Sequence, residues 1–444
     1  MVRIRRCSVV PRPRPVLMRS ALVLAVTSLG LPGGTGAQEV VTLDEAISLA
    51  VPRSPVYGQA LASVDNARET RRTAIGAFLP SLAVSSGATM RPGSVFDPDL
   101  QSYVDATNRS FTGGVSVGMQ LFTGGRNRAE LDRASREIEA ADASLAGQRF
   151  QLVLDVKRTF FGALEQADLL EVAEARVLRA EESLELVRQR VLAGAATASD
   201  SLRARLELAN ARQGALQTEA QLRAARMALG RRIGAPGPVG AAVPADLDPS
   251  VLPLSDEELY RQAELASPSV RASELARAAD EASVTSARSS YLPTARISTG
   301  YNWSNNEWEF GGGDGRWSGL SLSLSYSVFN GFGRESTVAR AENQLRVSRL
   351  QEGDIRLQAR EGADAALVAL RTAERAIGIA EEAAMVAEED LRVVRERLAV
   401  GVATAFELVT SQVALDEAEA NRVVTRYDYL IARAELEALL GQEL

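Results

Sequence analysis

The chain has 444 residues, a formal net charge of −7, a single cysteine and no histidine. Without imidazole there is no Ser-His-Asp or Cys-His catalytic site and no ordinary zinc site, and one cysteine excludes a disulfide within the chain. Lys157 is the only lysine, and no motif of a phosphate-binding loop surrounds it. We therefore expect no enzyme activity, no catalytic residue, no cofactor and no metal. The acidic balance argues against a nucleic-acid partner.

Residues 1–37 have the pattern of a cleaved export signal. Six arginines accompany an apolar stretch from Ser20 to Leu31, and Thr35-Gly36-Ala37 supplies small residues for cleavage before Gln38. The apolar stretch is too short to span a bilayer alone. No later segment is long and apolar enough for a membrane helix, whereas membrane strands carry a weaker, alternating signal and stay possible.

Residues 38–232 are predicted to form a first structural repeat. Its elements are a starting helix, strands at about 81–90 and 111–122, a long helix at about 126–192 and a return helix at about 198–230. A polar loop is expected between the strands, over Arg91–Ser110. The strands show apolar residues at every second position, and the long helix, free of proline, spans about 100 Å at ~1.5 Å per residue.

A connector at 233–254 contains five prolines and cannot be helical throughout. Residues 255–444 are then predicted to repeat the first plan. The expected elements are a starting helix, strands at about 294–303 and 318–329, a long helix at about 333–399 and a return helix at about 405–441.

The two halves resemble one another at constant spacings. Ser54-Pro55 recurs as Ser267-Pro268, and Leu79-Pro80 recurs as Leu292-Pro293 at the same spacing. The later motifs recur at a second, slightly shorter spacing, as one short deletion would produce. These motifs are Gly194, Thr197 and Asp200, which correspond to Gly401, Thr404 and Glu407. An internal duplication is the simplest explanation.

The four strands are predicted to cross a membrane. Each is about ten residues long, the length that a tilted membrane strand needs, and aromatic residues cluster near the second strand pair. They are Tyr301, Trp303, Trp308 and Trp317. Four strands leave two unpaired edges, and closed membrane barrels need about eight strands or more. Two chains would supply eight strands and three would supply twelve; the small polar residues along the strands favour the wider, trimeric barrel.

The long helices carry apolar residues every seven positions, as in Leu170, Val177, Leu184 and Val191, which predicts side-by-side packing as in coiled coils. The predicted fold class is thus a mixed α and β membrane protein. A homotrimeric twelve-stranded β-barrel, with four strands from each chain, continues into a long helical barrel.

At this point the chain resembles the TolC-like outer-membrane factor family. The resemblance rests on the tandem repeat, the Leu-Pro pairs, the strand-to-helix turns at Phe122 and Phe329, the helical turns at Gly194 and Gly401, and the segment 426–430. It implies a trimeric exit duct in the outer membrane of a Gram-negative bacterium, with a large periplasmic part. The partners implied are a periplasmic adaptor protein, an inner-membrane transporter and outer-membrane lipid.

The helical turns are the candidate functional sites. Gly194, Thr197, Gly401 and Thr404 lie where two helices meet, and an adaptor is expected to dock there. Asp200 and Glu407 follow the turns. Facing a lumen, each would form a ring of three carboxylates that attracts cations; alternatively, each is an acidic residue favoured at a helix N-terminus.

The resemblance adds further gate candidates. It implies that Glu407 faces the lumen and that Arg426 helps to hold a closed state. Family members carry a second acidic residue at the position of Thr410, and a basic and an aromatic residue at those of Ala403 and Leu398. A weaker constriction is therefore expected here.

A different class of function stays open at this stage. A periplasmic coiled-coil protein with a structural or tethering role would explain the helices, although not the four strands. For a duct, the cargo could be drugs, metals or proteins, because cargo choice lies mainly in the pump.

Overall fold

The structure is a computed structural model that describes residues 40–244, 252, 255–305 and 313–444. The chain divides into two compact units, Met1–Gln38 and Glu39–Leu444, and every described residue belongs to the second unit. The predicted signal peptide, the connector residues 245–251, 253 and 254, and Trp308 lie outside the described residues.

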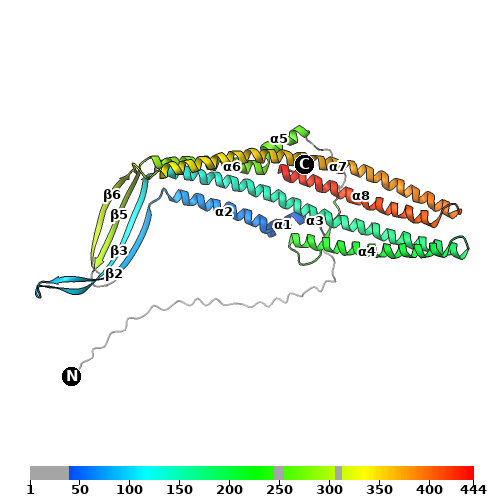
Figure 1. The fold of residues 1–444 in the computed structure, drawn as a ribbon, viewed down its shortest axis with the longest axis horizontal. Helices are drawn as coiled ribbons and strands as arrows, with labels where there is room; N and C mark the ends of the chain where they lie inside the picture. Colours follow the sequence, from blue (N-terminus) through cyan, green and yellow to red (C-terminus); the bar gives the residue numbers. More distant parts are fainter. Residues whose placement is uncertain (1–39, 245–251, 253–254, 306–312) are drawn as a thin grey trace, which may run out of the picture. The chain divides into compact units, whose positions relative to one another are not determined.

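The two halves contain the same elements in the same order (Figure 1). The first half consists of α1 (Leu43–Ala50), α2 (Pro55–Gly76), β2 (Ser81–Asp97), β3 (Ser102–Phe122), α3 (Arg126–Leu192) and α4 (Ala198–Ile233). The second half consists of α5 (Asp256–Ala266), α6 (Pro268–Arg288), β5 (Thr294–Asn305), β6 (Asp314–Ser325), α7 (Gly333–Ala399) and α8 (Ala405–Leu440). Both long helices have 67 residues and both return helices have 36, so these helices match in length between the two halves.

Short polar motifs set the beginnings of the helices. Thr42 and Glu45 cap α1 reciprocally, because each side chain accepts a hydrogen bond from the other residue's backbone N–H. Ser54 and Ser267 precede prolines that form the first residues of α2 and α6, where a missing N–H costs nothing. A two-residue parallel pair, β1 (Val40–Val41) with β4 (Gly240–Ala241), ties the start of the first half to the connector.

The four long strands form one antiparallel sheet in the order β2-β3-β5-β6. The central pair, β3 with β5, joins the two halves of the chain. In the described part of the chain, β2 and β6 are the edge strands. Each edge strand therefore presents backbone groups that another strand can pair with.

The prediction of a loop over Arg91–Ser110 is wrong. The β2–β3 ladder continues through these residues to the pair Asp97–Ser102, beyond the last β3–β5 pair at Phe111–Asn305. The rings of Phe96 and Tyr103 meet edge to face across this extension, with centroids 5.4 Å apart. The polar residues and glycine of this segment suggested a loop. A two-stranded ribbon without a covering layer is exposed on both faces, so its strands need not alternate apolar with polar residues.

The strand expected at 318–329 is also placed wrongly, because β6 begins at Asp314 and ends at Ser325. Ser325 pairs with Thr294, and the residue before Thr294 is Pro293, which has no N–H to extend the ladder. Beyond this point Arg334 of α7 donates hydrogen bonds to the carbonyl oxygens of Ser327 and Val328, both at 2.9 Å. A buried guanidinium thus satisfies carbonyls that a longer strand would have used.

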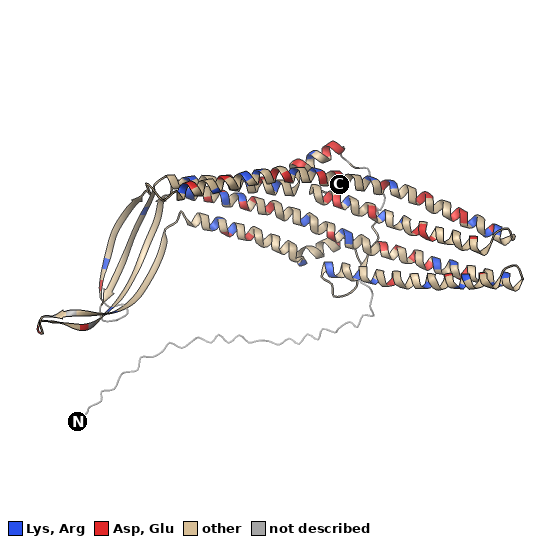
Figure 2. Ribbon diagram, in the orientation of Figure 1, with Lys and Arg blue, Asp and Glu red and all other residues tan. Residues whose placement is uncertain are grey.

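The two faces of the sheet differ in character. One face carries rows such as Leu82, Val117, Thr299 and Leu320, and the other carries rows such as Ser81, Gly118, Ser298 and Ser321. The leucines on β2 and β6 are about 70% exposed in the single chain. Charged residues are sparse on the sheet and frequent along the helices (Figure 2).

Each long helix is covered along its whole length by different partners. The first part of α3 packs against α2 and α6, and its second part packs against α4 and α8 (Figure 1). Near the helix ends, Leu184 and Val187 of α3 pack against Leu208 of α4, and Leu391 of α7 packs in the same cluster as Leu408 of α8. None of the described helices combines the length and apolarity that crossing a membrane requires.

We expect Arg334→Met to lower the free energy of unfolding by about 2 kcal/mol, because the hydrogen bonds from the buried guanidinium to two backbone carbonyls are lost. The guanidinium also lies 5.1 Å from the Tyr291 ring centroid, a contact that methionine cannot replace electrostatically. Chemical unfolding followed by far-ultraviolet circular dichroism measures the change. Arg340→Met, at an exposed position on the same helix, is the control. Equal stability of the two variants would contradict the capping role.

Candidate functional site: the helix tips and the contacts between the helix pairs

The turn between α3 and α4 is closed by Gly194. Its φ of +73° is a left-handed conformation that favours glycine. The N–H of Ala195 donates to the carbonyl of Arg190 at 2.8 Å and the N–H of Gly194 donates to that of Val191, so the last carbonyls of α3 are satisfied inside the turn. The turn is therefore compact, and its backbone shape depends on one residue.

Thr197 and Asp200 form the N-terminal cap of α4. The backbone N–H of Thr197 donates to the Asp200 carboxylate at 2.9 Å, and the N–H of Asp200 donates to the Thr197 hydroxyl at 3.3 Å. Hydrogen bonds from the Thr197 backbone and side chain lower the pKa of Asp200 below its ordinary value. Asp200 is thus ionised and is held in place by its own helix.

The turn between α7 and α8 repeats this design with one addition. Gly401 has a φ of +81°, and Thr404 caps α8 by accepting a hydrogen bond from the N–H of Glu407 at 3.2 Å. The Glu407 carboxylate also forms an ion pair with Arg397, at 3.6 Å. The Asp200 carboxylate therefore completes the cap of its helix, whereas the Glu407 carboxylate contacts the Thr404 hydroxyl and Arg397. No contact between Asp200 and Glu407 is found among the described residues.

The other predicted gate residues lie apart from one another. Thr410 donates its hydroxyl hydrogen bond to the carbonyl of Phe406 within α8. Leu398 and Ala403 are both buried, in the cluster that packs α7 against α8. Arg426 is an exposed residue of α8, more than five helical turns beyond the tip at ~3.6 residues per turn. The sequence-predicted residues thus lie on two turns and on one more distant helix position, and do not form a single cluster.

Sequence reasoning missed a cluster of charges that joins the two helix pairs. Arg179 of α3 contacts two carboxylates of α8, Asp416 at 2.6 Å and Glu419 at 2.7 Å. Arg176, one turn earlier on α3, contacts Asp416 at 3.2 Å and Glu207 of α4 at 2.6 Å. The cluster therefore links α3, α4 and α8, and we call it the inter-pair ion cluster.

Asp416 is the central residue of this cluster. It is 7% exposed, and burial raises its pKa above the ordinary value although Arg179 and Arg176 favour the charged form. Gln412, one turn away on α8, donates a hydrogen bond to the backbone carbonyl of Arg179 at 3.3 Å. A buried charge with two arginine partners is costly to separate from either of them.

Further polar contacts between the two helix pairs lie on both sides of the cluster. Toward the tip, Arg190 donates a hydrogen bond to the carbonyl of Leu398 in the last turn of α7. Away from the tip, the buried Tyr427 donates to Asp168 at 2.7 Å, and Lys157 contacts Glu437. Burial and the Asp168 carboxylate raise the pKa of Tyr427. The one lysine of the chain therefore has a structural role in the contact between α3 and α8, which we call the seam.

These contacts follow one rule that the sequence contained. Positions rise along α3 as they fall along α8, as antiparallel neighbours require, so Lys157, Asp168 and Arg179 meet partners in reverse order. The order of these residues would have predicted the contacts from the sequence only if α8 had been known to lie beside α3. Among the described residues, no group of three or more acidic, histidine or cysteine side chains is arranged to hold a metal ion.

We expect Asp416→Asn to lower the free energy of unfolding by about 2 kcal/mol, because Arg176 and Arg179 stay buried with less countercharge. Thermal unfolding of the purified protein measures the effect. Glu417→Gln, the next residue and exposed, removes the same charge from the chain and serves as the control. If both variants melt with the wild type, the inter-pair ion cluster contributes nothing to stability.

The chain matches a known family over both halves. The sequence profile described as outer membrane efflux protein matches residues 46–235 and 259–442, one match on each structural repeat. The chain is 28% identical over 324 residues to protein CyaE of Bordetella pertussis, covering 70% of this chain and 66% of that relative. It is 29% identical over 227 residues to the cobalt-zinc-cadmium resistance protein CzcC of Cupriavidus metallidurans, covering 51% and 54%. The matches thus span about two thirds and about half of these relatives' lengths.

Solved structures share the fold. A membrane protein from Pseudomonas aeruginosa gives a TM-score of 0.78 at 20% identity, covering 91% of each chain. CusC gives a TM-score of 0.79 at 18% identity, covering 94% of this chain and 96% of that one. The predicted mixed α and β fold class and the predicted resemblance are confirmed. On the strength of the two profile matches, the chain belongs to the outer membrane efflux protein family.

Proposed function

We propose that three copies of this chain assemble into an exit duct across the outer membrane of a Gram-negative bacterium. The observation that carries the proposal is the four-stranded sheet, which has two edge strands, one apolar face and one polar face. Free edges cannot be tolerated in hydrocarbon, because lipid offers no hydrogen-bond partner. Pairing β6 of each copy with β2 of the next closes a barrel of twelve strands.

In this assembly the helices continue the barrel into the periplasm. A helix of 67 residues is about 100 Å long. Three chains supply a ring of paired helices around a wet path, and solutes pass through it without a chemical step. We propose that an inner-membrane transporter supplies the energy and that a periplasmic adaptor protein joins it to the helix tips. We therefore assign no enzyme activity, and we propose that residues 1–37 direct export as a cleaved signal peptide.

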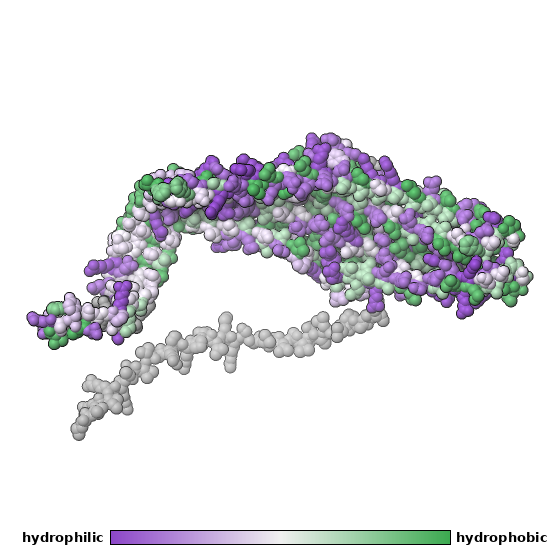
Figure 3. All heavy atoms as spheres, in the orientation of Figure 1, coloured by the Kyte–Doolittle hydropathy of each residue, from purple (hydrophilic) through white to green (hydrophobic). Residues whose placement is uncertain are grey.

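The helix tips suit adaptor docking. Four large apolar side chains around the two turns are more than 60% exposed: Leu192, Val400, Val402 and Phe406. Figure 3 shows hydrophobic surface at this end of α3, α4, α7 and α8. The turns that carry Gly194 and Gly401 each have five residues between their helices, and such short connections present a defined shape for a partner to recognise.

The inter-pair ion cluster supports a gate near the tips. Opening a ring of helix pairs requires α7 and α8 to move relative to α3 and α4, and this movement separates Arg179 from Asp416 and Arg190 from the Leu398 carbonyl. In a trimer each of these contacts occurs three times. Asp200 and Glu407 then line the narrow end as rings of three carboxylates, which raise the local cation concentration.

The first test is assembly and conductance. Full-length protein purified from outer membranes is expected to run as a trimer by light scattering in detergent and to form ion-conducting channels in planar bilayers. A protein that is monomeric in detergent, or one that fractionates with soluble periplasmic proteins and does not conduct, would refute the duct and favour a coiled-coil tethering role.

Gly401→Val is expected to reduce export by at least about tenfold, because a β-branched residue at φ +81° distorts the docking turn. Trimers should still form, since the turn is far from the sheet. Export of the pump's substrate by cells that express the variant gives the readout. Gly378→Val, in open space on the exposed surface of α7, is the control. Wild-type export by the Gly401 variant would argue against docking at this turn.

Glu407→Gln is expected to weaken block by divalent cations about threefold, because one ring of three charges is lost. Magnesium added to the helical side of single channels in planar bilayers is the probe. Glu417→Gln has the same charge change on the same helix and should leave the block unchanged. An unaltered block in both variants would remove Glu407 from the constriction.

A further inference from the structure

The few charges in the four-stranded part of the sheet are confined to one face. Within the four-stranded part, the described residues of the apolar face include no charged side chain. The polar face carries Arg296 on β5, and Arg316 with Asp314 on β6. All three side chains are exposed. With two arginines against one aspartate among the described residues, this face carries more positive than negative charge, although the whole chain is acidic.

Arg296 lies on β5 near the helical end of the sheet, where the neighbouring strand β3 leaves room for its side chain. Arg296 pairs with Gln120 of β3 on one side and with Ser323 of β6 on the other. The side chain lies over Gly118, where an added Cβ atom would be 2.6 Å from a terminal guanidinium nitrogen and 3.3 Å from Cζ. The absence of a side chain at Gly118 thus allows the guanidinium to lie along the surface of the sheet.

The same arrangement occurs further along β3. Asn302 lies over Gly114, where an added Cβ atom would be 2.4 Å from its Oδ1 atom. Asn302 of β5 pairs with Arg316 of β6. Along β5, Asn302 lies about 20 Å from Arg296 at ~3.4 Å per residue. Glycines of β3 therefore place polar side chains of β5 flat against the face on which both arginines stand.

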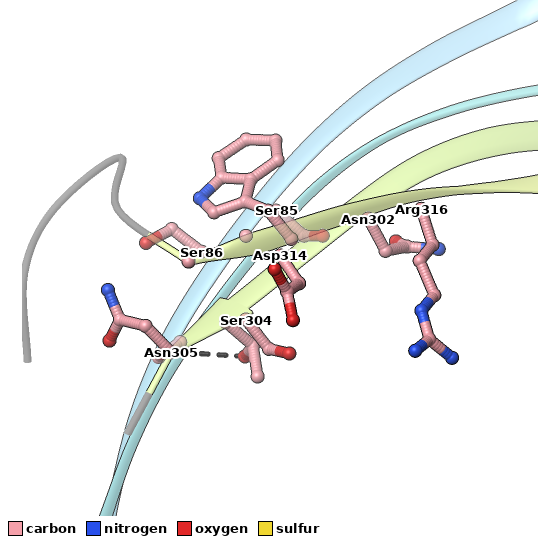
Figure 4. A pocket seen from close by; sticks show the side chains of 12 residues that line it. Ser85, Ser86, Asn302, Ser304, Asn305, Asp314 and Arg316 are labelled. Atoms are coloured by element: carbon pink, nitrogen blue, oxygen red, sulfur yellow. Dashed lines mark hydrogen bonds between the residues drawn. The ribbon is translucent and has the colours of Figure 1, made fainter. Parts of the chain in front are cut away.

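Arg316 marks the other end of this face. It borders a hollow of about 1100 Å³ that is also lined by Ser85, Asn302, Ser304 and Asp314. Figure 4 shows Arg316 and Asp314 projecting from β6 to the same side of the strand. Neither Arg296 nor Arg316 forms an ion pair with any residue that the structure describes. Both guanidinium groups are therefore available to solutes.

We propose that Arg296 and Arg316 make the barrel wall attractive to anionic solutes, such as small organic carboxylates, sulfates and phosphates. The inference rests on the proposed duct, in which the apolar face meets lipid and the polar face meets the lumen. Three copies then give two rings of three guanidinium groups, which stay charged at every physiological pH and pair well with planar oxyanions. Lining charge of one sign raises the local concentration of the opposite ion.

The sign of this wall is opposite to that of the helix tips. Asp200 and Glu407 carry negative charge at the far ends of the helices, whereas the sheet carries the arginines. A solute with a carboxylate would thus be held least at the entrance and most at the exit. The charge order along the duct therefore predicts a sided response to anions and cations.

The test uses single channels of the full chain in planar bilayers under a potassium chloride gradient, with citrate added on the sheet side as a blocking anion. In the double variant Arg296→Gln and Arg316→Gln, we expect the anion-over-cation permeability ratio to fall about threefold and the citrate block to weaken by a similar factor. Asp314→Asn should change both quantities in the opposite direction, and Arg296→Lys should retain most of the wild-type ratio.

Arg340→Gln, on an exposed helix position, is the charge-matched control and should behave as the wild type. Channels that conduct normally while the double variant keeps the wild-type ratio and citrate block would overturn the anion-attracting wall and leave the duct intact. Absence of any conductance in the wild type would overturn the duct itself, and the wall with it.

Discussion

Most of the stability of a 67-residue helix in a protein comes from neighbours that cover its apolar positions, and this constraint shapes the molecule. The chain meets it by giving each long helix different partners along its length. The part of α3 near the sheet is covered by α2 and α6, and the part near the tip by α4 and α8. Because the second half of the chain supplies α6 and α8, neither repeat is complete without the other.

Polar contacts then fix how the helices align. Apolar stripes rich in alanine and leucine permit small shifts along a helix pair, whereas Asp416 has acceptable surroundings only between Arg176 and Arg179. Tyr427 with Asp168 and Lys157 with Glu437 set the same alignment further along. The seam between α3 and α8 is thus specified by a few buried charges, and these are also the contacts that any relative movement of the helix pairs must separate.

The sheet follows a different logic. Its two faces are distinguished by alternation, and its width is limited by the four strands that one chain provides. Glycines on the central strand β3 allow larger side chains of β5 to lie across the pair, as Arg296 does over Gly118 and Trp303 does over Gly113. The junction between the two repeats is therefore a pairing of small residues with large ones, which brings the strands together without crowding.

The sequence by itself determined the repeat, the fold class and the family resemblance, because these depend on periodicity and on short capping and turn motifs that act locally. Ser267-Pro268 and the turn at Gly401 needed no knowledge of distant neighbours. Only the tertiary structure decided that Arg91–Ser110 continues a hairpin, that Arg334 ends β6 early and that Asp416 meets Arg179. Each of these depends on which backbone groups and charges are brought together from positions far apart in the chain, and a local pattern carries no information about that pairing.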